Sequence, residues 1–118
     1  MIYRRKTYII DSSFIEEFNA LFNDILLPSQ LKYGARLIGR WMINKDEENT
    51  EVFALWEYDS LQAYEEIEDK IKQDEEHVKR VQNRFDEIGR ERIKKVLKED
   101  IKQEFITSTV PREKTILR

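Results

Sequence analysis

The residues best suited to chemistry lie on two neighbouring apolar stretches, residues 36–43 and 51–58. Each stretch has a charged side chain in its interior, Arg40 in the first and Glu57 in the second. A few fixed polar groups in an otherwise apolar cavity are what orient a small ligand. The sequence therefore predicts a ligand-binding pocket, and its candidate residues are Arg40, Trp41, Met42, Phe53, Trp56 and Glu57.

A structural interpretation of the same residues is equally open. Arg40 and Glu57 could pair with each other, or with a partner chain at the edge of a sheet, because an unpaired buried charge is costly. Trp41 and Trp56 are large apolar residues, which are more often part of a core than of a ligand platform. The pattern assigns no catalytic role to any of these residues.

His77 is the only histidine in the chain. An imidazole can titrate near neutral pH, so His77 could be a haem ligand or an acid–base group. The favoured interpretation is a partly exposed polar residue beside Glu75, Glu76 and Lys79. The chain has no cysteine and no second histidine to complete a metal site, so neither a metal nor a cofactor is expected.

Composition favours a single cytoplasmic domain of 118 residues. Although 38% of the residues are charged, the net charge is only −3, and acidic side chains interrupt the basic ones. That balance argues against nucleic-acid binding. No apolar run has the length of a membrane span or follows the basic N-terminus as a signal peptide would. The sequence also has no glycine-rich phosphate loop and no Ser-His-Asp ordering.

The first third of the chain predicts a strand followed by a helix. Residues Ile2–Ile10 are rich in β-branched and aromatic side chains, as strands are. Ser13 and Glu16 have the spacing of a capping box, and apolar residues then recur at helical spacing up to Ile25. Pro28 is expected to end this helix, because proline inside a helix removes a hydrogen bond.

The remainder predicts a hairpin, a long helical region and a last strand. Residues 36–43 and 51–58 are strand-like, and a polar loop separates them. Ser60 is predicted to cap a second helix, with a break or a new N-cap at Asp74. Residues 104–110 predict a fourth strand.

The predicted order β-α-β-β-α-β is the ferredoxin-like arrangement of an α+β fold. It has a four-stranded antiparallel sheet with helices on one face. One domain is expected over residues 1–111, with a loosely held C-terminal tail over residues 112–118.

The hairpin also predicts a partner. If Asn44 faces Glu51, one face of the hairpin carries Leu37, Gly39, Trp41, Ile43, Val52, Ala54, Trp56 and Tyr58. The other face then carries Ile38, Arg40, Met42, Phe53, Leu55 and Glu57. Both faces are largely apolar, whereas a half-exposed antiparallel sheet alternates apolar with polar residues. A second copy of the chain is expected to cover the face without helices; the long helix or the tail is the alternative.

Several short motifs resemble those of the NIPSNAP-domain proteins, within the dimeric α+β barrel superfamily. The resemblance spans most of residues 2–76, and its motif residues are Tyr3, Lys6, Tyr8, Pro28, Lys32, Gly34, Gly39, Trp56, Tyr58, Ser60, Leu61 and Asp74. It implies a homodimer of ferredoxin-like chains that form a barrel. The family strand usually continues Tyr-Glu-Leu, where this chain has Arg4 and Arg5. The family helix tends to carry two arginines four residues apart, where this chain has Tyr64 and Glu68.

The resemblance leaves three functions open. The first is a homodimeric barrel that binds a small apolar ligand between its sheets. The second is a cofactor-free monooxygenase or isomerase-type enzyme of the same superfamily. Against it, the histidine typical of the monooxygenase branch is replaced by Ile67, and the first strand lacks the asparagine that the haem-degrading members use. The third is a structural protein-interaction module that docks through its long helix.

Overall fold

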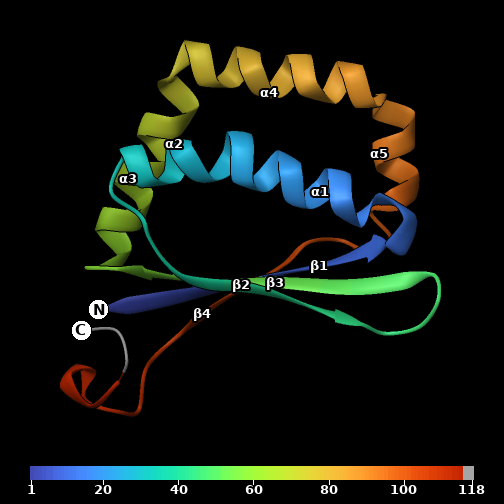
Figure 1. Cartoon of the computed structure of the whole chain (residues 1–118). Coiled ribbons are helices and arrows are strands. Elements are labelled where there is room, and N and C mark those ends of the chain that lie inside the picture. The colour runs from blue at the N-terminus through green and yellow to red at the C-terminus, as the bar shows by residue number, and fades with distance from the viewer. Residues whose placement is uncertain (116–118) are drawn as a thin grey trace.

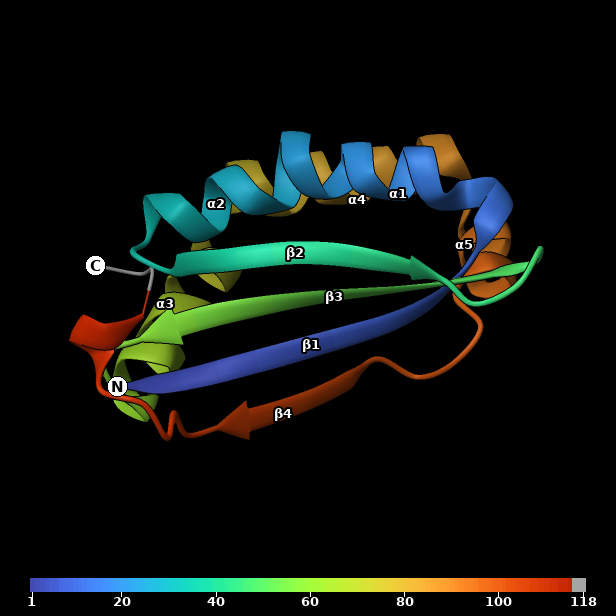
Figure 2. The same ribbon diagram turned by 60° about the horizontal axis from the view of Figure 1, so that its bottom comes forward.

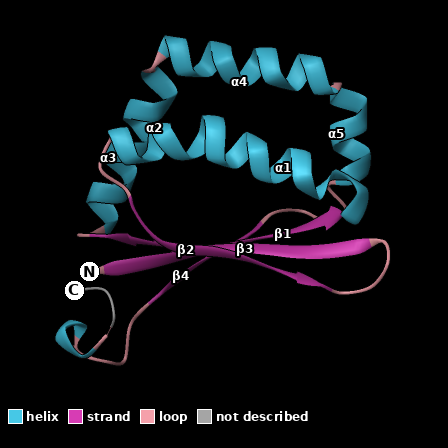
Figure 3. Ribbon diagram, viewed as in Figure 1, coloured by secondary structure: helices cyan, strands magenta, loops and turns pink. Residues whose placement is uncertain are grey.

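A computed structural model describes residues 1–115 of the chain (Figures 1 and 3). Its elements, in chain order, are β1 (Ile2–Asp11), η1 (Ser12–Phe14), α1 (Ile15–Leu21), η2 (Phe22–Leu26), α2 (Leu27–Lys32), β2 (Arg36–Asn44), β3 (Asn49–Tyr58), α3 (Leu61–Gln73), α4 (Glu75–Ile88), α5 (Arg90–Val96), β4 (Lys102–Ile106) and η3 (Arg112–Lys114). No helix among the described residues is long and apolar enough to cross a membrane.

The four strands form one antiparallel sheet in the order β2-β3-β1-β4 (Figure 2). Helices α1 to α5 lie on one face of this sheet, and the other face carries no α-helix (Figure 1). This arrangement confirms the predicted α+β, ferredoxin-like fold. The two central strands are β3 and β1. Because β1 pairs with β4, the sheet places residues from both ends of the chain side by side.

The last strand differs from its prediction. β4 covers Lys102–Ile106 instead of residues 104–110. Ile106 pairs with Tyr3, next to the start of β1, so no strand remains to pair with the residues that follow. Those residues turn instead, and the Val110 N–H donates to the Ser108 hydroxyl. Their β propensity is overridden because a strand needs a partner.

The predicted hairpin register is wrong by one residue. Asn44 pairs with Thr50 and not with Glu51. The reason lies in the loop, where the Asp46 carboxylate accepts hydrogen bonds from two backbone N–H groups, those of Glu48 and Asn49. This turn closes the loop one residue earlier than the polar run suggested, and β3 begins at Asn49.

A bulge between Leu37 and Gly39 adds a second change to β2. Beyond the bulge, Arg40 pairs with Ala54 and Met42 with Val52, on the face covered by helices. Because a slip of one residue moves every side chain to the opposite face, the predicted faces of β2 are exchanged after residue 38.

The face without α-helices, the open face, has an apolar centre. It contains Gly39, Trp41, Ile43, Phe53 and Leu55, which the register places on the same side of the sheet. The Trp41 and Phe53 rings pack with their centroids 5.6 Å apart, and Trp41 is 48% exposed. The Trp41 indole lies over Gly39 and leaves no room for a Cβ atom there.

The first helical region runs past its predicted end. Pro28 does not terminate it, because a π-helical turn at Phe22–Leu26 precedes the proline and α2 continues to Lys32. Pro28 lies in the first turn of α2, where its missing N–H is tolerated. The predicted Ser13 cap is also replaced: Asp11 accepts a hydrogen bond from the Ser13 N–H and caps η1.

Both predicted caps in the second helical region are confirmed. Ser60 accepts a hydrogen bond from the Ala63 N–H at the start of α3. Asp74 accepts one from the His77 N–H at the start of α4. Gly89, with φ of 99°, then ends α4 and lets α5 turn toward the sheet.

Candidate functional site

An apolar chamber of about 280 Å³ lies between the sheet and the helices. Its walls come from β1, from η1, α1, η2, α4 and α5, and from the segment that joins α5 to β4. The lining residues are Lys6, Tyr8, Ile10, Phe14, Phe18, Leu21, Leu26, Phe85, Ile93, Val96, Leu97 and Ile101. A cavity of this size and composition suits a small organic molecule.

Two helices hold the chamber open. α3 and α5 stand between the sheet and α4, and α1 runs beside α4 (Figure 1). The lower end of α5 is fixed to β1, because Leu97 bridges to Ile10 and the Lys98 N–H donates to the Ile9 carbonyl at 2.9 Å. α4 is thereby kept away from the sheet, and apolar side chains of α1, α4 and α5 enclose the space between them.

Lys6 is the one cationic side chain in the chamber lining. It is half-buried, and its Nζ lies 5.7 Å from the centre of the Tyr8 ring. Tyr8 in turn packs edge-on against Phe18, with ring centres 5.2 Å apart. Exposed Ile101 and half-buried Lys6 mark the side on which the chamber meets solvent.

One part of this site could be recognised in the sequence, namely the residues that β1 contributes. Lys6, Tyr8 and Ile10 are two residues apart along β1, so they must share one face of the strand. The lining residues on the helices have no comparable sequence signal. Apolar side chains at helical spacing form an ordinary core as readily as a cavity wall.

The six predicted pocket residues are not brought together. Trp56 is in the core and 2% exposed, which confirms its predicted burial. Its cross-strand partner is Leu37, whereas the predicted pairing of Asn44 with Glu51 would have placed Gly39 opposite it. Trp41 and Phe53 lie on the open face, and Met42 is 53% exposed on the face that carries the helices.

Arg40 is held against aromatic rings on the helix side of the sheet. Its guanidinium carbon lies 4.3 Å from the centre of the Phe22 ring and 5.1 Å from that of Phe18. Its Nη1 donates to the Asn19 side-chain carbonyl at 2.7 Å. Burial lowers the pKa of Arg40, and cation–π contacts partly replace the lost water.

Glu57 lies on the opposite face from Arg40, so the prediction that the two share a face is wrong and they do not pair with each other. Glu57 is 3% exposed and accepts hydrogen bonds from Arg36 Nε at 2.8 Å, the Tyr3 hydroxyl at 3.0 Å and Arg112 Nη2 at 3.2 Å. Burial alone would raise its pKa, but the hydrogen bonds from Arg36 and Tyr3 and the nearby arginines hold the pKa below its usual value. Glu57 therefore anchors the beginning of the tail; residues 116–118, the rest of it, lie outside the described residues.

Arg4 is a buried charge that the sequence interpretation missed. It is 3% exposed, and its guanidinium lies over the rings of Trp56, Tyr58 and Tyr64 at 5.0–5.7 Å. Its Nη2 is 3.7 Å from a Glu68 carboxylate oxygen. Arg4 and Glu68 therefore bring two opposite charges together inside the fold.

The buried hydroxyl beside Arg4 stays neutral. Desolvation raises the pKa of Tyr58 to about 12, although the positive charge of Arg4 acts in the opposite direction. Tyr58 is 1% exposed, and its ring packs edge-on against Tyr64. The aromatic rings around Arg4 thus form part of the core, and none of them lines the chamber.

His77 is buried, so its interpretation as a partly exposed surface residue is wrong. It is 6% exposed at the start of α4, and burial lowers the pKa of its imidazole. His77 is not among the residues that line the chamber. The polar neighbours in sequence, Glu75 and Glu76, face solvent, whereas the helix turns His77 inward.

Acidification is expected to destabilise the protein through Asp74. Hydrogen bonds from the Tyr33 hydroxyl, the His77 N–H and Lys32 lower the pKa of Asp74 from 3.8 to about 2. This stabilisation is complete above about pH 4 and is lost as the pH falls through 2. Urea unfolding should show that Asp74→Asn loses less stability than the wild type over that interval. Equal losses in both proteins would contradict this role.

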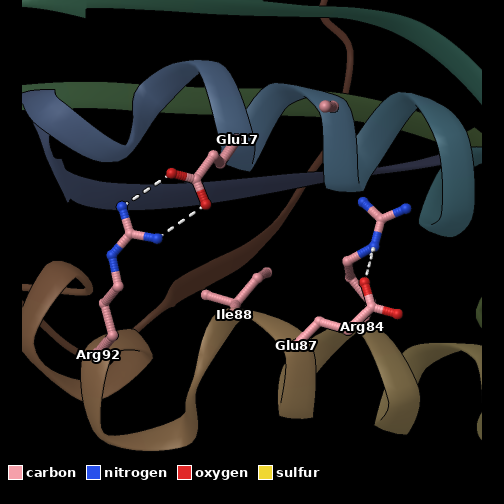
Figure 4. A pocket seen from close by; sticks show the side chains of 6 residues that line it. Glu17, Arg84, Glu87, Ile88 and Arg92 are labelled. Carbon is pink, nitrogen blue, oxygen red and sulfur yellow. Dashed lines mark hydrogen bonds and ion pairs between the residues drawn. The ribbon is translucent and has the colours of Figure 1, made fainter.

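A second hollow, of about 300 Å³, lies on the surface between α1 and the α4–α5 region (Figure 4). Its charged residues bind one another: both Arg92 Nη atoms donate to Glu17 at 2.8 Å, and Arg84 pairs with Glu87. Arg92 also lies over the Phe14 ring at 5.0 Å, and Phe14 belongs to the chamber wall. The ion pair between Arg92 and Glu17 thus stabilises the chamber wall from the outside.

The sheet, its single helical layer and the space between them define an α+β domain of the ferredoxin-like class. The NIPSNAP family model matches residues 3–99, and the chain belongs to this family. The match extends through α5, beyond the residues that carry the resemblance in the sequence. No match was found among curated proteins.

Solved structures agree on the fold. An uncharacterised NIPSNAP domain protein from Burkholderia xenovorans is 22% identical, with a TM-score of 0.70 over 94% of this chain and 99% of that one. A NIPSNAP family protein of unknown function from Agrobacterium tumefaciens is 19% identical, with a TM-score of 0.65 over 90% and 86%. A dimeric ferredoxin-like protein from an uncultured marine organism is 17% identical, with a TM-score of 0.50 over 93% and 99%.

Proposed function

We propose that this NIPSNAP protein binds a small apolar ligand in the chamber between its sheet and its helices. The observation that carries the proposal is the chamber itself, about 280 Å³ in volume and lined almost entirely by apolar and aromatic side chains. The sequence placed the ligand between the sheets of two chains. The chamber is a stronger candidate because one chain encloses it.

The lining favours binding over catalysis. Its polar groups are the Lys6 ammonium and the Tyr8 hydroxyl, and the lining described here contains no histidine or carboxylate to act as a partner in acid–base chemistry. The alternative, a cofactor-free monooxygenase or isomerase, would need such a pair or a reactive substrate.

Calorimetric titration with naphthalene tests the chamber. Saturable binding is expected, and Ile93→Trp should weaken it at least tenfold, because the larger side chain would fill part of the space. Leu31→Trp is the matched control, since Leu31 lies on α2, is 51% exposed and is not part of the lining. Failure of naphthalene to bind, or equal binding by both variants, would overturn the proposal.

We further propose that two chains associate through their open faces to form the barrel. The apolar centre around Trp41, Ile43 and Phe53 supports this, because exposed apolar patches mark interfaces. A face that meets its own copy gives a closed two-fold dimer. The similar ferredoxin-like protein that is described as dimeric adds support.

Light scattering at low micromolar concentration should give about twice the chain mass of 14.3 kDa. Phe53→Lys should shift the protein toward the monomer, because it places a charge at the apolar centre of the interface. Met42→Lys is the control: Met42 is on the neighbouring strand but on the helix side. A monodisperse wild-type monomer, or equal weakening by both lysines, would refute the open-face dimer.

A further inference from the structure

We propose that the chamber ligand carries a carboxylate and that Lys6 is the residue that binds it. This inference rests on the proposed function, since it requires a ligand in the chamber. Its structural basis is a cation that has no carboxylate partner among residues 1–115 and lies at the edge of an otherwise apolar cavity.

Lys6 differs from the two cations that precede it on β1. Arg4 pairs with Glu68, and Arg5 pairs with Glu104 at 2.8 Å. Lys6, over residues 1–115, has no carboxylate within ion-pair distance, and its ammonium lies over the face of the Tyr8 ring. Its cross-strand neighbours are Ala54 and Gln103, and neither carries a charge.

The environment of Lys6 suits an anion from outside the chain. Half-buried lysine loses part of its hydration, and a charge-assisted hydrogen bond to a carboxylate replaces it more strongly than a neutral acceptor does. Nearby acidic side chains are already engaged: Asp11 with Lys98, Glu104 with Arg5, and Glu17 with Arg92. A bound carboxylate would therefore meet the Lys6 ammonium without a competing internal partner.

The volume of the chamber limits the apolar part of the ligand. At roughly 30 Å³ for each small group, about 280 Å³ accommodates about nine such groups. The ligand class is thus a medium-chain or aryl carboxylic acid with its apolar part between β1 and the helices. Its carboxylate would lie beside Lys6, on the side where exposed Ile101 borders the chamber.

The test compares octanoate with octanol, which has the same chain length and no charge, by calorimetric titration below their aggregation limits. Octanoate should bind the wild type at least about tenfold tighter. Lys6→Met should abolish this preference and leave octanol binding unchanged, whereas Lys6→Arg should restore the preference. Arg5→Met is the matched control, because Arg5 is the adjacent cation on the opposite, open face. Circular dichroism establishes that each variant is folded.

The outcomes separate the two proposals. Equal affinity of octanoate and octanol in the wild type, or a preference that survives in Lys6→Met, would overturn the role of Lys6 and leave the chamber as an apolar site. If Arg5→Met loses the preference for octanoate to the same extent, the preference arises from net charge, and this result would also overturn the role of Lys6. Failure of naphthalene to bind, in contrast, would reject the chamber itself.

Discussion

Replacing Trp56 by alanine is expected to destabilise the protein by about 3–5 kcal/mol in urea unfolding. Trp56 is 2% exposed on the central strand β3, and its ring centre is 6.1 Å from that of Phe22 on the helix layer. It also forms one of the three ring contacts of the buried Arg4 guanidinium. Alanine would leave a cavity at the junction of sheet, helix and buried charge, which the surroundings cannot fill by a small movement.

Leu31→Ala is the control for this measurement. Leu31 is 51% exposed, so its truncation should change the unfolding free energy by no more than about 0.5 kcal/mol. A loss below about 1 kcal/mol for Trp56→Ala would be incompatible with a buried indole. Such a result would also call into question the register that places Trp56 beside Arg4.

Glu68→Ala is expected to cost about 3 kcal/mol, because it removes the counter-charge of a cation that is 3% exposed. The three surrounding rings and the hydrogen bond from Arg4 to Gln103 at 3.2 Å would remain. They attract the cation but do not neutralise it. The unfolding free energy from urea titration measures the loss.

The double variant Arg4→Met/Glu68→Leu provides the decisive comparison. Apolar residues of similar volume remove both charges together, and such replacements of buried ion pairs are commonly neutral or stabilising. The double variant should therefore be more stable than Glu68→Ala alone. If both proteins lose the same amount, the cost arises from packing at position 68, and Arg4 does not depend on its partner.

The types and order of the elements follow from the sequence, because they depend on local properties. Runs rich in β-branched and aromatic residues specify β1 and β3, and helical spacing specifies the α-helices. The caps at Ser60 and Asp74 need only a side-chain oxygen and an N–H three residues later, so both are predictable. From these elements the ferredoxin-like arrangement follows, with the family resemblance in agreement.

The site could not be predicted in the same way, because its residues come from separate parts of the chain. Lys6 and Ile101 border one chamber although 95 positions separate them. The pairing of β1 with β4, in which Lys6 faces Gln103, brings them together, and the bridge between Leu97 and Ile10 holds α5 beside them. An apolar helix stripe specifies burial, and the helix positions then determine whether the buried space is filled or left as a cavity.

The tertiary structure alone also decided which side each hairpin residue faces. The sequence determined that β2 and β3 are strands, but the Asp46 turn and the bulge after Leu37 set their register. Together they placed Arg40 on the helix side and Trp41 on the open face, so that Trp41 shares a face with Phe53 and not, as predicted, with Trp56. The physical reason is that side chains alternate with a period of two, so a single-residue change in pairing inverts every face without changing the local pattern.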